Sequence, residues 1–420
     1  MIRRNRLARS LVTGLLNHLR GGTLELVDPI GQSCFGQRDH LGPGAPVAAR
    51  VDVHDTGVYE RILRAGNVGL GESYADGWWD ADDLAGVLRL ALRSLEKISE
   101  RRDTLHRLAT PVLDPIARLR RADLDRDARN VRAHYDLGNE FFRHLLDETM
   151  AYSCAIFDAP GMTLAEASRA KFDRLAHTLD LSPGDRLLEI GTGWGGFALH
   201  AAERYGCVVT TTTISRAQFE FATERVRAAG LEHRITVLDR DYRDLRGTFD
   251  KAVAIEMIEA VDWREYDVFF ASLRHLLTHD GALAMQAIVV PDASFDRLKR
   301  HTDFIKAAIF PGGCLPSIGA LTAAASRSAL TLRNVDSIGP HYGETLRRWR
   351  ANLDALTPEL PTLGLDARFA RLWDFYLAYC EAGFDERYID ATQLLYTAQH
   401  APTRREPSTD RYPQLDSIAV

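Results

Sequence analysis

The residues best suited to chemistry gather around a glycine-rich turn at residues 187–196. The run Leu-Leu-Glu-Ile-Gly-Thr-Gly-Trp-Gly-Gly ends an apolar strand with Glu189 and continues through Gly191, Gly193 and Gly195. Glycine permits both a tight turn and the close approach of a ligand to the backbone. No lysine follows as it does in a phosphate-binding loop, so the turn suits a nucleoside ligand with little phosphate, such as S-adenosylmethionine. A purely structural turn is the alternative.

Four further polar clusters stand where the ends of neighbouring strands would bring them to one site. They are Tyr152-Ser153-Cys154, Thr212-Thr213-Ile214-Ser215 with Gln218, Asp241-Tyr242-Arg243 and Glu256-Met257-Ile258-Glu259. Hydroxyl groups and the Gln218 amide would replace the acid that binds ribose in many comparable sheets. Asp241 is a candidate for the adenine amino group, or an ordinary turn residue. Glu259 follows an apolar strand, so its carboxylate needs a partner or a shifted pKa, unless it only begins a helix.

A sheet is needed to bring these clusters together. The sequence predicts one, because expected strands alternate with expected helices from about residue 129 onward. The expected strands are residues 186–190, 207–213, 235–239, 249–256, 282–290, 330–338 and 393–398. This alternation predicts an α/β fold with a largely parallel sheet and ligands at the carboxyl ends of its strands. The segment 294–316 interrupts the rhythm, which is typical of a lid or a substrate-binding element.

The first hundred residues predict a smaller α+β domain. Short β-like runs at 23–27 and 47–53 precede helical stretches at 58–65 and 83–99. We therefore divide the chain into an N-terminal domain (1–99), a linker (100–128), a second domain (129–400) and a mobile tail (401–420). The first twenty residues hold five arginines and no acid. They predict a solvated basic helix or a helix that rests on anionic lipid headgroups.

The overall composition narrows the classes of function. A chain of 420 residues with 45% apolar and 26% charged residues is typical of a two-domain globular protein. The net charge of −6 argues against nucleic acid as the main partner. Five scattered cysteines without a C-x-x-C pair indicate a reducing compartment and neither a disulfide framework nor a structural metal site. No apolar run is long enough to cross a bilayer.

Together the clusters resemble the cyclopropane-fatty-acyl-phospholipid synthases, S-adenosylmethionine-dependent methyltransferases related to the mycolic acid cyclopropane synthases. The resemblance covers nearly the whole chain and also includes His134-Tyr135-Asp136-Leu137-Gly138-Asn139 and Ile309-Phe310-Pro311-Gly312-Gly313-Cys314-Leu315-Pro316. It implies a Rossmann-like seven-stranded methyltransferase sheet and a smaller N-terminal domain that engages lipid and dimerises. The cofactor-binding candidates are Tyr152, Ser153, Glu189, Gly191, Gly193, Trp194, Gly195, Thr213, Ser215, Gln218, Asp241 and Tyr242.

The resemblance also implies a reaction. The methyl group of the sulfonium is transferred to a cis double bond of an acyl chain in a membrane phospholipid, and a bound bicarbonate removes a proton so that a cyclopropane ring closes. Side chains matching Cys154, Glu259 and Tyr342 would hold the bicarbonate, with the backbone at Ile288 nearby. The side-chain amide of Gln286 can also hydrogen-bond the anion. His134 and Tyr135 complete the catalytic candidates, and the rings of Tyr135, Phe141 and Phe310 would stabilise the cation.

Three positions depart from the pattern of the family. Thr192 replaces a cysteine, and Ala260 and Gln286 each replace a histidine found in many relatives. The residues around Glu256–Glu259 resemble a branch that includes enzymes making methylene- or methyl-branched acids. A methylene-branched product and a non-catalytic lipid-binding relative are therefore the alternatives. The resemblance implies a cytoplasmic protein peripherally bound to the inner membrane, and a homodimer is compatible with it.

Overall fold

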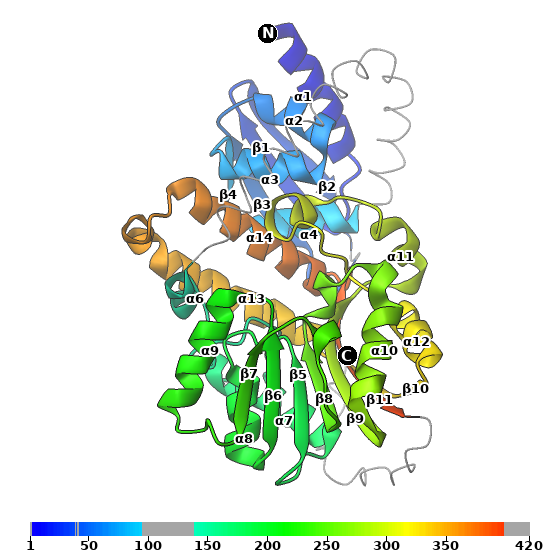
Figure 1. The fold of residues 1–420 in the computed structure, drawn as a ribbon. Coiled ribbons are helices and arrows are strands. Elements are labelled where there is room, and N and C mark those ends of the chain that lie inside the picture. Colours follow the sequence, from blue (N-terminus) through cyan, green and yellow to red (C-terminus); the bar gives the residue numbers. More distant parts are fainter. Residues whose placement is uncertain (1, 38, 40–41, 95–137, 399–420) are drawn as a thin grey trace.

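The computed structural model describes the whole chain except residues 1, 38, 40–41, 95–137 and 399–420 (Figure 1). Its strands form one sheet of four and one of seven, in the orders β2-β1-β3-β4 and β10-β11-β9-β8-β5-β6-β7. The expected α/β fold with a seven-stranded sheet and a smaller N-terminal sheet is thereby confirmed. The predicted linker and tail, together with His134 and Tyr135, lie outside the described residues.

The seven-stranded sheet is mostly parallel. Its strands are β5 (Arg186–Ile190), β6 (Val208–Thr213), β7 (Ile235–Asp239), β8 (Phe249–Ile255), β9 (Leu277–Val289), β10 (Leu330–Ser337) and β11 (Asp390–Ala398). Strands β5 to β9 run parallel to one another, whereas β11 runs antiparallel to both β9 and β10. All seven predicted strands are present, although β9 and β11 begin earlier than expected, at Leu277 and Asp390.

Helices cover both faces of this sheet (Figure 1). The helices of this part of the chain are α6 (Asn139–Leu145), α7 (Leu164–Leu179), α8 (Gly196–Tyr205), α9 (Arg216–Ala228), α10 (Tyr266–Leu276), α11 (Asp292–Leu298), α12 (Ile318–Arg327), α13 (Gly339–Leu356) and α14 (Ala367–Asp385). Successive strand residues point to opposite faces. Leu187 therefore joins the core formed with α7 and α8, and Leu188 joins the core formed with α10 and α12.

The N-terminal part builds its own small unit. Its elements are α1 (Ile2–Leu16), β1 (Gly22–Asp28), β2 (Gly31–Gln37), β3 (Val47–Val53), α2 (Gly57–Ala65), α3 (Asn67–Ala75), β4 (Trp79–Ala81) and α4 (Leu84–Arg93). Strand β1 pairs antiparallel with β2 and parallel with β3. Over the described part of the chain, no helix is long and apolar enough to cross a membrane.

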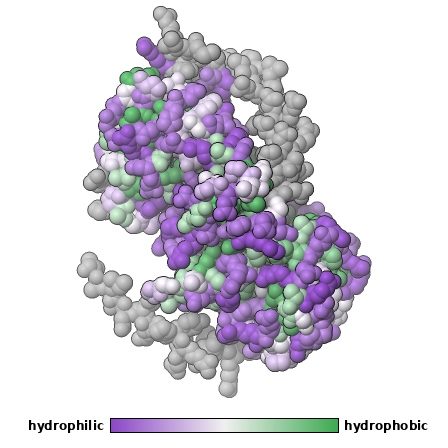
Figure 2. Space-filling model, turned by 90° about the vertical axis from the view of Figure 1, so that its left-hand side faces the viewer, coloured by the Kyte–Doolittle hydropathy of each residue, from purple (hydrophilic) through white to green (hydrophobic). Residues whose placement is uncertain are grey.

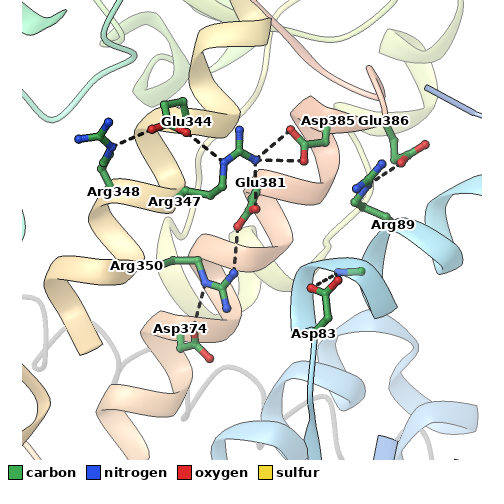
Figure 3. A network of polar contacts seen from close by, with 11 residues as sticks. Asp83, Arg89, Glu344, Arg347, Arg348, Arg350, Asp374, Glu381, Asp385 and Glu386 are labelled. Atoms are coloured by element: carbon green, nitrogen blue, oxygen red, sulfur yellow. Dashed lines mark hydrogen bonds and ion pairs between the residues drawn. The ribbon is translucent and has the colours of Figure 1, made fainter. Parts of the chain in front are cut away.

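Helix α14 joins the two units. Tyr74 of α3 donates a hydrogen bond to Asp374 of α14 at 2.8 Å, and Arg89 and Arg93 of α4 pair with Glu386 at 2.7 and 2.8 Å. Figure 3 shows how this network continues between α13 and α14 through Arg347, Arg350, Glu381 and Asp385. The N-terminal unit is therefore held against the unit that contains the seven-stranded sheet, and both units can contribute to one cavity.

Candidate active site

The glycine-rich turn after β5 leaves part of its backbone uncovered. Gly191, Gly193 and Gly195 have φ values of +92°, +52° and +87°, which side chains disfavour. A Cβ on Gly193 would meet no atom within 4 Å, whereas one on Gly195 would lie 3.3 Å from Ala222. Gly191 approaches Met257, directly after β8. The open face at Gly193 fits the close approach of S-adenosylmethionine, and Gly195 instead serves packing.

Glu189 supports this turn from inside the protein. Its buried carboxyl group accepts a hydrogen bond from the Thr211 hydroxyl at 2.6 Å, and Thr211 also contacts the Thr192 hydroxyl at 2.7 Å. Burial raises the pKa of Glu189 to about 8. The threonine in place of the family's cysteine thus belongs to a hydrogen-bonded group beneath the turn.

The end of β6 provides the polar groups expected beside a ribose. Thr213 donates to the side-chain oxygen of Gln218 at 3.0 Å, and Ser215 caps α9. Ser215 and Gln218 line the main cavity together with Trp194 and Tyr152. These hydroxyl and amide groups can bond to ribose hydroxyls without an acid.

The residues of the turn after β7 already make contacts within the protein. Asp241 accepts hydrogen bonds from the backbone and the guanidinium of Arg243 at 2.8–2.9 Å, and these bonds lower its pKa. Tyr242 is buried with its ring against Phe269. A contact between Asp241 and adenine stays a prediction, and it would share a carboxylate that already binds an arginine.

An apolar cavity of about 1350 Å³ extends between the two units. The N-terminal unit contributes Leu24, Val51, Leu63 and Leu88 to its wall, and the segment 294–316, predicted as a substrate-binding element, contributes Ile305, Ile309 and Phe310. Figure 2 shows a mainly hydrophilic face on which hydrophobic residues gather at the waist between the units. Phe141, expected to face a cation, instead packs in the core against Trp373 and Phe369.

At the inner end of the cavity, Glu256 is the centre of a hydrogen-bonded cluster. Its Oε1 accepts from the Cys154 backbone N–H at 2.9 Å and from the Gln286 amide at 2.8 Å. Its Oε2 accepts from the Tyr342 hydroxyl at 2.6 Å. Glu256 also has a φ of +47°, a conformation that costs a non-glycine residue about 1–3 kcal/mol. Such strain is typical of functional positions.

Cys154 acts in this cluster through its backbone and not through its thiol. The side chain is fully buried, and the sulfur lies near the carbonyl oxygens of Ala155 and Ile338 at 3.3 and 3.7 Å. Burial raises the pKa of the thiol well above its usual value, so a thiolate is disfavoured. The expected side-chain role of Cys154 is therefore replaced by a backbone hydrogen bond.

Glu259 accepts a hydrogen bond from the backbone N–H of Ile288, the last group of the expected bicarbonate pocket. Its Oε1 accepts from the Ile288 backbone N–H at 2.6 Å, and its buried Oε2 has no hydrogen-bond partner in the described structure. Burial, followed by the charge of Glu256, raises the pKa of Glu259 to about 8. The Cys154 N–H, the Gln286 amide and the Tyr342 hydroxyl thus bond to Glu256, and the Ile288 N–H bonds to Glu259. Because protein carboxylates already occupy these donors, the residues do not fit a pocket for a free anion.

Glu256 is the functional residue that the sequence reasoning did not select. It belongs to the cluster Glu256–Glu259 named above, but Glu259 was selected because a carboxylate that follows an apolar strand is expected to be partly enclosed. The available signal was its position: Glu256 directly follows β8, Glu189 is the last residue but one of β5, and these strands are neighbours in the sheet. Acids at the ends of adjacent parallel strands meet at one edge.

The raised pKa of Glu259 predicts a pH-dependent stability. Between pH of about 4.5 and about 8 the folded carboxyl keeps a proton that the unfolded one has released, so stability falls as pH rises. Glu259→Gln cannot ionise and keeps an acceptor for Ile288. As the pH rises from about 5 to about 8, we expect the free energy of unfolding of this variant to increase by about 2 kcal/mol relative to that of the unchanged protein, measured by urea unfolding. Glu232→Gln, at an exposed glutamate, is the control. If the stability of Glu259→Gln depended on pH in the same way as that of the unchanged protein, the prediction would be wrong.

Comparisons with known proteins agree with this geometry. The family model described as mycolic acid cyclopropane synthetase matches residues 122–394. Tuberculostearic acid methyltransferase UfaA1 of Mycobacterium tuberculosis is 40% identical over 372 residues, covering 86% of each chain. Cyclopropane-fatty-acyl-phospholipid synthase of Escherichia coli is 35% identical and covers 85% of this chain and 89% of its own. The solved structure of cyclopropane synthase CmaA1 with SAH and CTAB is 34% identical, with a TM-score of 0.59 over 64% of this chain and 98% of that one.

Proposed function

The chain belongs to the mycolic acid cyclopropane synthetase family and is an S-adenosylmethionine-dependent methyltransferase, and we propose that it acts on the cis double bond of an unsaturated acyl chain in a phospholipid. The product is a cyclopropane fatty acid. The observation that carries the proposal is that one apolar cavity is lined both by the N-terminal unit and by Glu256, Glu259 and Ser215. An acyl chain in this cavity would bring its middle beside the cofactor.

The geometry supports each requirement of this reaction. When bound, S-adenosylmethionine supplies an electrophilic methyl group, and the open backbone at Gly193 and the hydroxyl groups after β6 would hold it. An alkene is a weak nucleophile, so the cavity must align the double bond and exclude water. The rings of Tyr152 and Tyr376, whose hydroxyls lie 2.8 Å apart, line the cavity and can face a developing cation.

A methylene-branched fatty acid is the second candidate product. One relative with 40% identity is named a methyltransferase of tuberculostearic acid and not a cyclopropane synthase. Both products follow from the same first cation. Loss of a proton from the added carbon closes the ring directly, whereas the methylene branch forms when a hydride shift first moves the cation to the methylated carbon.

Incubation of the protein with labelled S-adenosylmethionine and vesicles of unsaturated phospholipid tests the proposal. Mass spectrometry of the acyl chains should show a gain of one carbon, and NMR should show cyclopropane protons. Olefinic methylene protons would favour the second candidate, and an absence of label in the acyl chains would contradict both.

We also propose that the protein binds the membrane surface through helix α1. Arg9 pairs with Asp28 at 2.5 Å and Arg20 with Asp39 at 3.2 Å. We assign the lipid contact to Arg3, Arg4 and Arg6 from their place in the sequence, at the start of the helix. A helix of this charge suits the anionic inner face of a cytoplasmic membrane. Gel filtration with light scattering tests the homodimer implied by the resemblance.

Binding to vesicles should therefore depend on charge. We expect stronger sedimentation with anionic than with neutral vesicles, and a loss of that difference when salt rises to about 0.5 M. Replacing Arg3, Arg4 and Arg6 together by glutamine should weaken binding to anionic vesicles at least about tenfold. Equal binding of the unchanged protein to both kinds of vesicle would contradict a role for these charges.

A further inference from the structure

The cluster around Glu256 places a carboxylate of the chain where the resemblance implied a bound bicarbonate. The Cys154 N–H, the Gln286 amide and the Tyr342 hydroxyl all donate to it. Gln286 is itself held by Gln393, whose amide donates to the Gln286 oxygen at 2.9 Å. That contact turns the Gln286 N–H groups toward Glu256. The result is three donors, fixed in place, around one carboxylate that lines the cavity.

Resting on the proposed function, we propose that Glu256 is the general base of the reaction and that this enzyme needs no bicarbonate. A bicarbonate ion presents a carboxylate-like pair of oxygens, and Glu256 presents the same group covalently attached. It has one further advantage, since an attached base needs no separate binding step. The strained backbone at Glu256 is the cost of directing that side chain back into the cavity.

The proton transfer balances without another reactant. The π electrons of the alkene form the bond to the incoming methyl carbon, and the carbon–sulfur pair stays with sulfur, which leaves a cation on the acyl chain. Oε2 of Glu256 accepts one proton from the added carbon. The released pair of electrons forms the third side of the ring. For the methylene-branched product, the hydrogen on the methylated carbon first moves with its electron pair to the neighbouring cationic carbon, and the pair released with the proton then forms the double bond to the added carbon. Glu256 then returns the proton to water after the product leaves.

The surroundings of Glu256 support its use as a base. Oε2 receives one hydrogen bond, from Tyr342, and a carboxylate oxygen can accept a second, so a lone pair is left for the proton. The fully buried Lys171, bonded to Ser153 at 2.5 Å, favours the ionised form of Glu256 by its charge. Burial acts in the opposite direction and raises the pKa of Glu256. A base with a raised pKa is well matched to proton abstraction.

The test combines two variants with bicarbonate depletion. Glu256→Gln keeps the size of the side chain but cannot accept the proton, and Glu256→Gly relieves the positive φ and empties a carboxylate-sized space. Product formation is measured in buffer stripped of carbon dioxide and in buffer with added bicarbonate. Affinity for S-adenosylmethionine is measured by calorimetry, and binding of ¹³C-bicarbonate is followed by NMR. Glu232→Gln, at an exposed glutamate, is the matched control.

The unchanged enzyme should be equally active in both buffers. Glu256→Gln should lose product formation at least about 100-fold, with cofactor affinity unchanged within about twofold. Glu256→Gly should bind ¹³C-bicarbonate, which the unchanged protein should not, and should regain activity when bicarbonate is added. Dependence of the unchanged enzyme on bicarbonate, or near-normal activity of Glu256→Gln, would overturn the inference.

A different result would contradict the proposed function, namely that the unchanged protein modifies no acyl chain in either buffer. The NMR measurement then still decides the inference about the pocket. Bicarbonate bound by the unchanged protein would overturn it, and bicarbonate bound only by Glu256→Gly would support it.

Discussion

Gly193→Val is expected to weaken S-adenosylmethionine binding at least about 100-fold while the protein stays folded. The φ of +52° is unfavourable for valine, and the new side chain would fill the open space over the backbone where the cofactor must approach. A Cβ at this position would touch no protein atom within 4 Å, so the protein has no internal clash to relieve. The substitution should therefore reduce the affinity for S-adenosylmethionine and not disrupt the packing of the protein. Isothermal calorimetry gives the affinity, and circular dichroism reports the fold.

Gly184→Val provides a matched control. Gly184 also has a positive φ, +89°, and a Cβ there would also meet no atom within 4 Å, but it lies in the exposed turn before β5. Both variants should lose similar stability from the same backbone strain, and only Gly193→Val should lose the cofactor. Equal affinities in the two variants would show that the turn does not contact the cofactor.

Tyr342→Phe should lower kcat about 10- to 100-fold and leave the affinity for S-adenosylmethionine unchanged. The tyrosine hydroxyl donates to Glu256 and lowers the pKa of that carboxyl. Without it the pKa of Glu256 rises, and the ionised base forms only at higher pH. The acidic limb of the pH–rate profile should therefore move to higher pH. The other groups that act on Glu256, namely the Cys154 N–H, the Gln286 amide and Lys171, remain in the variant.

Tyr205→Phe is the control for this experiment. Tyr205, at the end of α8, also donates to a carboxylate, that of Asp173 at 2.8 Å, but on the helical layer away from the cavity. Its removal should change neither kcat nor the pH profile. If Tyr342→Phe lowered kcat without moving the profile, Tyr342 would act by packing, through its stacked contact with Phe384 at 4.2 Å, and not through the charge of Glu256.

Several features were accessible from sequence because they depend on local patterns. Strand β5 and the turn after it follow from an apolar run that ends in glycines. The order of elements from β5 to β9 follows from the alternation of strands with mostly helical segments. The carboxyl ends of parallel strands share one edge, so the clusters at Glu189, Thr213 and Glu256 could be assigned to one site. The family and the cofactor follow from the same motifs.

Only the tertiary structure shows which hydrogen-bond donors surround Glu256 and which contact Glu259. Glu256 and Glu259 are three residues apart, and no local pattern distinguishes them. The left-handed backbone at Glu256 turns its carboxylate toward Cys154, Gln286 and Tyr342, which come from three other parts of the chain. Glu259 turns instead to the Ile288 N–H.

The sequence by itself therefore determined the fold, the cofactor turn and the edge of the sheet at which the reaction takes place. The identity of the base, and the apolar cavity shared by the two units, were decided only in three dimensions. The physical reason is that a carboxylate is stabilised by donors from distant strands and helices, and that an acyl-chain cavity is lined by side chains which separate elements bring together.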